Sequence, residues 1–209
     1  MKLLHIDSSI LGDNSASRQL SQSVVKAWQA AEPSSVVTYR DLAADAISHF
    51  SSLTLAAGGT AAELHDAAQR HEAELSASTL EEFLAADAIV IAAPMYNFSV
   101  PTSLRAWFDY VLRAGETFSY SEAGPKGLLG GKRVIVIESR GGLYSEGPAK
   151  VIDFQEPYLR HLLGFVGLTD VTFVHAEKIG YGPDARSAAL TQAKARIAVL
   201  AQPALASAA

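Results

Sequence analysis

The sequence predicts one α/β domain over residues 1–200, built on a doubly wound sheet of five parallel strands. Short apolar runs alternate with longer amphipathic segments along the chain, which is the pattern of repeated strand–helix–strand units. The run Val134-Ile135-Val136-Ile137 is continuous in β-branched residues, as expected of a parallel strand buried on both faces. Right-handed crossovers between such strands place helices on both sides of the sheet.

The N-terminal half begins with an expected strand at residues 2–7, a polar loop at 8–17 and a helix at 18–31. Leu20, Val24 and Trp28 recur at helical spacing and mark the buried face of that helix. The second strand is expected at 36–40 and the third at 88–92. Residues 41–59 are expected to be irregular. Two short helices are predicted at about 60–75 and 78–86, the second because Ser78 or Thr79 precedes an acidic pair, as an N-cap does.

The C-terminal half continues with a helix at 101–112, since Pro101 suits a first helical turn. A Gly-rich insertion at 115–131 is expected to hold a small hairpin. The remaining elements are a strand at 133–138, a helix at 150–164, a strand at 170–175 and a helix at 184–200. The tail at 201–209 is low in complexity and is expected to fray.

Composition restricts the class of protein. The chain has 209 residues with 49% hydrophobic and 19% charged residues, which is ordinary for a compact domain. Its formal net charge of −5 argues against nucleic acid as a partner, because phosphate backbones require basic patches. It has no cysteine, hence no disulfide, thiolate nucleophile or zinc-thiolate site, and its six histidines show no metal-ligand spacing. Without a leader or a membrane-length apolar run, we expect a cytoplasmic protein with no membrane partner and no metal.

Three loops after predicted strands carry the chemistry. Residues 94–101 combine two prolines with Met95, Tyr96, Asn97 and Phe98, and exposed N–H groups flanked by aromatics suit a flat heteroaromatic guest with polar edges. The loop at 8–17 holds four serines ahead of a helix N-terminus, where a terminal phosphate is readily bound. Glycines in the loop at 139–142 allow close approach to a ring edge.

Each loop also has a plain structural explanation. The serines can simply cap the helix, the glycines can make an ordinary turn, and the aromatics can fill the core. The strand order 2-1-3-4-5 would bring the loops after strands 1, 3 and 4 to one crevice, and this coincidence favours it over the dinucleotide-binding order. The stretch Gly180–Ala185 matches a dinucleotide fingerprint in letters, but it follows the last strand and opens no βαβ unit.

The chain resembles the FMN-dependent NADH-azoreductases, which also act as NAD(P)H:quinone reductases and have a flavodoxin-like fold. The similarity extends over almost the whole chain and rests on these segments: Ile6–Leu11, Ser15-Ala16-Ser17, Ala93–Phe98, Ala114–Phe118, Gly130-Gly131-Lys132 and Ser139–Gly142. The match at Pro94-Met95-Tyr96-Asn97-Phe98, combined with the two other loops, is specific, whereas each piece alone is not.

The resemblance implies one FMN per chain. Its phosphate would be bound by Ser9, Ser15, Ala16 and Ser17. Its isoalloxazine would be contacted, chiefly through backbone groups, by Met95, Tyr96, Asn97 and Phe98, and its pyrimidine side lined by Ser139, Arg140, Gly141 and Gly142. On this basis Asn97→Pro is expected to remove one N–H donor and to damage flavin reduction more than folding.

The resemblance further implies a homodimer that uses NADH to reduce quinones and to cleave aromatic azo compounds in a ping-pong, two-electron cycle. Phe118, Tyr120 and Tyr144 are expected to line the substrate, the first two reaching the neighbouring subunit's site. No side chain is assigned as an obligatory proton donor, although Tyr120, Tyr144 and Arg140 are candidate polarising groups. A flavodoxin-type electron carrier and a regulatory FMN-binding module remain as alternatives.

Overall fold

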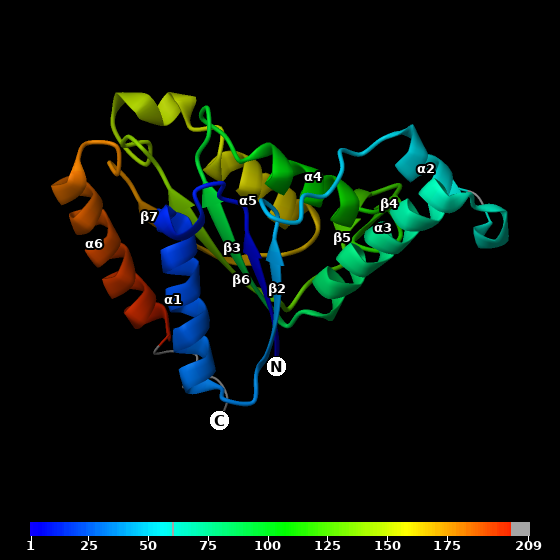
Figure 1. Ribbon diagram of the computed structural model, residues 1–209, viewed down its shortest axis with the longest axis horizontal. Coiled ribbons are helices and arrows are strands. Elements are labelled where there is room, and N and C mark those ends of the chain that lie inside the picture. The colour runs from blue at the N-terminus through cyan, green and yellow to red at the C-terminus, as the bar shows by residue number, and fades with distance from the viewer. Residues whose placement is uncertain (60, 202–209) are drawn as a thin grey trace.

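The computed structural model describes residues 1–59 and 61–201. Its main sheet has five parallel strands in the order β2-β1-β3-β6-β7 (Figure 1), so the predicted order 2-1-3-4-5 is confirmed. These strands are β1 (Lys2–Asp7), β2 (Val36–Asp41), β3 (Ala88–Pro94), β6 (Arg133–Ser139) and β7 (Asp170–Ala176). The predicted hairpin is also confirmed, as an antiparallel pair of β4 (Phe118–Ser121) and β5 (Gly124–Gly127).

Helices cover both faces of the sheet (Figure 1). On one face lie α1 (Ala16–Ala31) and α6 (Pro183–Ala201), and on the other α3 (Ala67–Ala85), α4 (Thr102–Val111) and α5 (Glu156–Phe165). The remaining helix, α2 (Ser52–Gly59), packs against α3. Short 3₁₀ turns occur at Gly12–Asn14, Ala62–Leu64 and Pro148–Ile152. Ala201 ends α6, and the rest of the tail predicted to fray lies outside the described residues.

Alternating side chains of the strands build two apolar layers. All seven residues of β3 are buried, as expected of a central strand. Leu3 and Val90 pack with Leu20 and Trp28 of α1, whereas Leu4 and Ile89 belong to the opposite layer. Complete burial of one such aliphatic side chain stabilises the fold by about 1.5–3 kcal/mol. These layers make the sheet a rigid platform whose strand ends position the loops.

The segment between β2 and β3 differs from its prediction. Residues 41–59 are not wholly irregular, because α2 occupies Ser52–Gly59, and one long α3 replaces the two short helices expected at 60–75 and 78–86. The buried Glu72 carboxylate accepts hydrogen bonds from Ser48, Thr54 and Tyr110 and thereby ties this segment to α3 and α4. Ser78 caps no helix, since its hydroxyl donates to Leu75 O within α3.

The start of α3 is set by a capping box at Asp66, in which Gln69 N donates to Asp66 Oδ1 and Asp66 N donates to Gln69 Oε1. The helix predicted at 150–164 also begins later than expected, at Glu156. The Asp153 carboxylate accepts the N–H groups of Gln155 and Glu156 and so fixes that start. Within the part of the chain that is described, no helix combines the length and hydropathy needed to cross a membrane.

Candidate functional site

Three loops meet at the carboxyl edge of the sheet, because they follow the adjacent strands β1, β3 and β6. The Tyr96 hydroxyl accepts the N–H of Ile10 at 3.2 Å and lies 3.3 Å from the Ser9 hydroxyl, which joins the first two loops. Met95 N donates to Ser139 O at 2.8 Å and joins the second loop to the third. The residues predicted to bind one ligand therefore belong to a single connected edge.

The serine loop leads directly into α1. The helix starts at Ala16, two residues before the predicted start, and Ser15 caps it by accepting the Arg18 N–H. The Ser15 and Ser17 hydroxyls lie 3.1 Å apart. Among residues 1–59 and 61–201, no acceptor faces the N–H groups of Ala16 and Ser17. A helix N-terminus with two free donors and two hydroxyls has the chemistry of a phosphate site, so capping and anion binding are compatible here.

Arg18 holds the backbone of that loop in place. Its guanidinium donates to Ser9 O from Nε at 3.0 Å and from Nη2 at 2.7 Å, and it forms a bidentate pair with Asp41. The hydrogen bond from Arg18 lowers the pKa of Asp41. Sequence reasoning missed Asp41, although an acidic residue at the end of β2 beside β1 was a readable signal.

A tight turn at Tyr96–Ser99 presents Asn97 and Phe98. Tyr96 N donates to Ser99 O and Ser99 N to Tyr96 O, while φ is +48° at Asn97 and +70° at Phe98. Two successive positive φ values between such a pair define a type I′ turn, whose second position normally takes glycine. Phenylalanine there costs on the order of 1–3 kcal/mol, yet its side chain is 44% exposed and gains little from burial. That strain favours a role for the Phe98 ring in binding.

The turn also corrects the expected effect of Asn97→Pro. Proline fixes φ near −65°, whereas Asn97 has φ +48°, so the substitution would rebuild the turn as well as remove a donor. The N–H groups of Asn97 and Phe98 donate to no group in the described part of the chain. They remain candidates for the edge of a flat ligand, but proline is not a clean probe of them.

The glycine loop lies against this turn. Gly141 and Gly142 donate from neither backbone N–H to any described residue, although both carbonyls accept hydrogen bonds. The Tyr144 ring packs edge-on against Phe98, with centroids 6.2 Å apart. A Cβ at position 142 would lie 3.1 Å from that ring, so glycine lets the tyrosine approach. Tyr144 therefore lies beside the turn that is predicted to contact the flavin.

Arg140 does not face the crevice, in contrast to its prediction as a flavin-lining and polarising residue. Its side chain is fully buried, its N–H donates to Ala176 O, and its carbonyl accepts from Ile179 N. The guanidinium contacts the carboxylates of Glu138, Asp153 and Glu177 at 2.6, 3.1 and 3.2 Å. The sequence showed that Arg140 was near the site, but not which way its side chain points.

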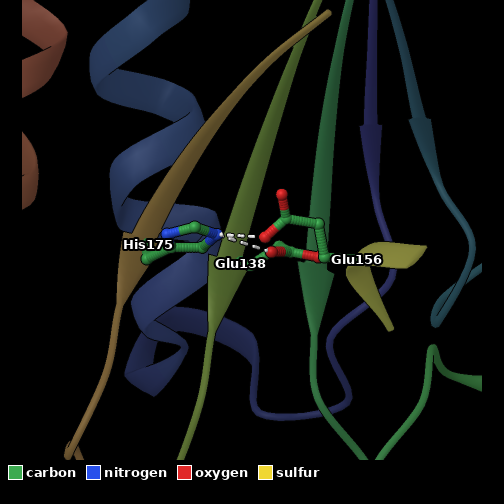
Figure 2. Close-up of side chains that lie close together, drawn as sticks. All are labelled: Glu138, Glu156 and His175. Atoms are coloured by element: carbon green, nitrogen blue, oxygen red, sulfur yellow. Dashed lines mark hydrogen bonds and ion pairs between the residues drawn. The ribbon is translucent and has the colours of Figure 1, made fainter. Parts of the chain in front are cut away.

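Glu138, Glu156 and His175 converge beside Arg140 (Figure 2). His175 Nε2 lies 3.0 Å from Glu138 Oε2 and 2.9 Å from Glu156 Oε2, and these two carboxylates raise the pKa of His175 to about 9. Hydrogen bonding to His175, together with Arg160, lowers the pKa of Glu156 to about 2. Burial raises the pKa of Glu138, whose Oε1 has no hydrogen-bond partner. The sequence suggested no such cluster because its members are far apart along the chain.

The hairpin places its two aromatic residues differently. Phe118 is buried with its ring centroid 4.7 Å from that of Phe165, on α5 of the same chain. Phe118 therefore packs within its own subunit, so little of its ring is left for the substrate-lining role predicted for it. Tyr120 is 71% exposed and remains available to a neighbouring molecule.

Comparison with known proteins identifies relatives along nearly the whole chain. A family described by its flavodoxin-like fold matches residues 1–200. The chain is 64% identical over 197 residues to FMN-dependent NADH:quinone oxidoreductase 3 of Pseudomonas fluorescens, covering 94% of this chain and 96% of that protein. It is 54% identical over 198 residues to FMN-dependent NADH:quinone oxidoreductase 2 of Pseudomonas aeruginosa, covering 95% and 97%. Among solved structures, an azoreductase from Bacillus anthracis is 27% identical with a TM-score of 0.86, over 96% and 98% of the two chains.

Proposed function

The chain belongs to the flavodoxin-like family of FMN-dependent NADH:quinone oxidoreductases and azoreductases, and from that premise we propose how its residues hold FMN and admit quinones and azo compounds. FMN is its cofactor and NADH its electron donor. One observation carries the proposal: unpaired donors from three adjacent loops converge at one edge of the sheet. Because NADH is a metabolite of the cytoplasm, we place the enzyme there.

The phosphate of FMN would lie at the start of α1. The free N–H groups of Ala16 and Ser17, the hydroxyls of Ser9, Ser15 and Ser17, and the positive end of the helix dipole form a donor set that fits a terminal phosphate. Arg18 contributes by fixing the Ser9 backbone and not by direct contact with the phosphate, since its guanidinium already donates to Ser9 O and pairs with Asp41.

The ring of FMN would lie between the turn at 95–98 and the glycine loop. The free N–H groups of Asn97, Phe98, Gly141 and Gly142 suit the carbonyl and nitrogen edge of an isoalloxazine. Bound there, FMN supplies hydride acceptance from NADH and two-electron transfer to the acceptor. The protein contributes position and exclusion of water, with Phe98 and Tyr144 bordering the place of a planar quinone or azo substrate.

Replacing Ser15 and Ser17 together by alanine is expected to weaken FMN binding by about 1–3 kcal/mol, or roughly 5- to 150-fold in Kd. The variant removes two hydroxyl donors from the site that would bind the negatively charged phosphate, but it leaves the backbone N–H groups in place. Fluorescence titration of apoprotein with FMN measures the change. Ser23→Ala is the matched control, because Ser23 lies on the same helix and only donates to Gln19 O. Equal affinity in the double variant and the control would place the phosphate elsewhere.

We further propose that the active unit is a homodimer. Several large apolar side chains are exposed beside the crevice: Val151, Ile152 and Phe154 are 81%, 38% and 58% exposed. Phe154 N donates to Phe98 O, so this apolar segment adjoins the strained turn. Apolar side chains gathered at one rim are typical of an interface. A second subunit would cover them and bring its own Tyr120 to the neighbouring flavin.

A mixture of two inactive variants tests whether Tyr120 acts across the interface. One chain carries Ser15→Ala and Ser17→Ala, and the other carries Tyr120→Ala. The concentration of FMN is set between the dissociation constants of the two variants for FMN. Random exchange is expected to restore about a quarter of wild-type activity, because each mixed dimer has one intact site. Phe118 is left unchanged because it stabilises its own subunit. If mixed dimers form but activity does not return, Tyr120 does not serve the neighbouring site.

A further inference from the structure

The side chain of Arg140 is 0% exposed although it follows β6 directly into the crevice loop. Its guanidinium reaches three segments of the chain. Nη2 contacts Glu138 on β6 and Asp153 ahead of α5, Nη1 contacts Glu177 after β7, and Nε donates to Gln155 Oε1 at 3.1 Å. A guanidinium offers five donors in a fixed plane, so it can satisfy such a set where a lysine cannot.

One branch of this network holds the loop after the glycines. The Glu177 carboxylate that contacts Arg140 also accepts the N–H groups of Tyr144 and Ser145 at 2.8 and 2.9 Å, and the Ser145 hydroxyl. Glu177 thus fixes the backbone that carries the Tyr144 ring. Its pKa is lowered by these hydrogen bonds against the opposing effect of burial, which keeps the carboxylate ionised.

A second branch holds the turn on the opposite side of the crevice. Gln155 is fully buried and donates from Nε2 to Ala93 O at 2.9 Å, at the end of β3. Phe154 N donates to Phe98 O at 3.0 Å, within the turn itself. The Phe98 and Tyr144 rings, each positioned by one branch, meet between them.

The cluster of Glu138, Glu156 and His175 has three groups able to bind a metal, with ligand atoms within 4.8 Å of one another. Arg140 Nη2 lies 2.6 Å from Glu138 Oε2 and 3.8 Å from Glu156 Oε2, so a guanidinium already stands where a cation would. A second cation at that place would meet strong repulsion. The cluster therefore belongs to the arginine network.

We propose that Arg140 is a positioning residue, whose guanidinium sets the separation between the Phe98 turn and the Tyr144 loop while touching neither flavin nor substrate. This proposal rests on the proposed function, since it assigns the two rings to the borders of the quinone site. A displacement of about 1 Å at such a border can cost up to about a hundredfold in rate, so the effect appears in catalysis and not only in stability.

The test loosens the Glu177 branch. Glu177→Ala removes all acceptors for the Tyr144 loop, Glu177→Gln retains an oxygen for the two N–H groups, and Glu146→Ala changes an exposed carboxylate of the same loop. Kinetics are measured per bound flavin with benzoquinone as acceptor. We expect Glu177→Ala to raise KM about tenfold or more, and Glu177→Gln and Glu146→Ala to stay within about threefold of wild type.

The outcomes separate the two proposals. Wild-type protein without NADH-dependent quinone reduction would refute the proposed function. Wild-type activity together with equal KM in Glu177→Ala and Glu146→Ala would overturn the positioning role alone. Arg140→Lys adds a direct check: if it folds and keeps wild-type KM and FMN affinity, the guanidinium is not needed. If it does not fold, the two Glu177 variants decide.

Discussion

Replacing Gly127 by alanine is expected to destabilise the protein by about 3 kcal/mol or more. A Cβ at this position would lie 2.1 Å from Gly167 N and 2.3 Å from Val166 C, and a backbone obstruction cannot rotate away. The hairpin would have to separate from the end of α5, where Leu129 N donates to Val166 O and Phe118 packs on Phe165. Thermal unfolding should shift downward by about 6–12 °C.

Gly130→Ala is the matched control for this substitution. Gly130 lies in the same insertion, and a Cβ there would meet nothing within 4 Å. It should therefore leave stability within about 1 kcal/mol of wild type. Since the hairpin carries Tyr120, we also expect Gly127→Ala to lose quinone reduction while α1 still binds FMN. Equal melting temperatures for the two alanine variants would mean that the hairpin does not pack as described.

Stability is expected to fall by about 2–3 kcal/mol as pH rises from 6.5 to above 9. The two glutamates raise the pKa of His175 from its ordinary 6.5 to about 9, and the imidazole is 29% exposed. A histidine that binds its proton more tightly in the folded chain stabilises the fold, and this stabilisation is fully present at pH values below its unfolded pKa. That contribution is lost as pH rises through the folded pKa. The chain has no cysteine, so no thiol titrates in this range.

At acid pH the dependence of stability on pH has the opposite sign, because stability rises with pH there. The pKa of Glu156 is lowered from 4.5 to about 2, so its contribution is complete above pH 4.5 and is lost as pH falls through 2. The His175–Glu156 contact is a single interaction, so the two contributions do not add. Urea unfolding from pH 4.5 to 9.5 measures the alkaline slope. His175→Gln should flatten it and the exposed His161→Gln should not, whereas an unchanged slope in His175→Gln would assign the loss to another group.

The central strands β3 and β6 could be predicted because each is an apolar run whose burial depends little on its partners. Only the strand ends moved, as β3 runs to Pro94 instead of stopping at 92. The segment at 41–86 could not be predicted in this way, because Glu72, Tyr110 and Ser48 decide it through contacts between distant residues. The capping box at Asp66 and Gln69 was a readable local signal that the acidic pair after Thr79 obscured.

The features of the candidate site likewise fall into those that could be predicted from the sequence and those that could not. Loop positions follow from strand order, so the residues that border the crevice could be predicted. Side-chain direction depends on partners elsewhere in the chain. The Arg140 side chain points inward because it donates to Gln155 and Glu177, and the Phe118 ring points inward because it packs on Phe165. The strained φ at Phe98 also lay outside sequence reasoning, since glycine is the residue that usually marks such a turn.

The strand order has a consequence for synthesis on the ribosome. Each strand pairs with an edge that has already been translated: β2 and β3 with β1, β6 with β3, and β7 with β6. The nascent sheet can therefore grow one strand at a time and never waits for a later strand. The crevice differs, because its contacts join residues far apart in the chain. The Tyr96 hydroxyl accepts the N–H of Ile10, 86 residues earlier, and Glu177 accepts a hydrogen bond from Arg140. The Tyr144 side of the crevice is therefore fixed only after β7 and Glu177 have been translated.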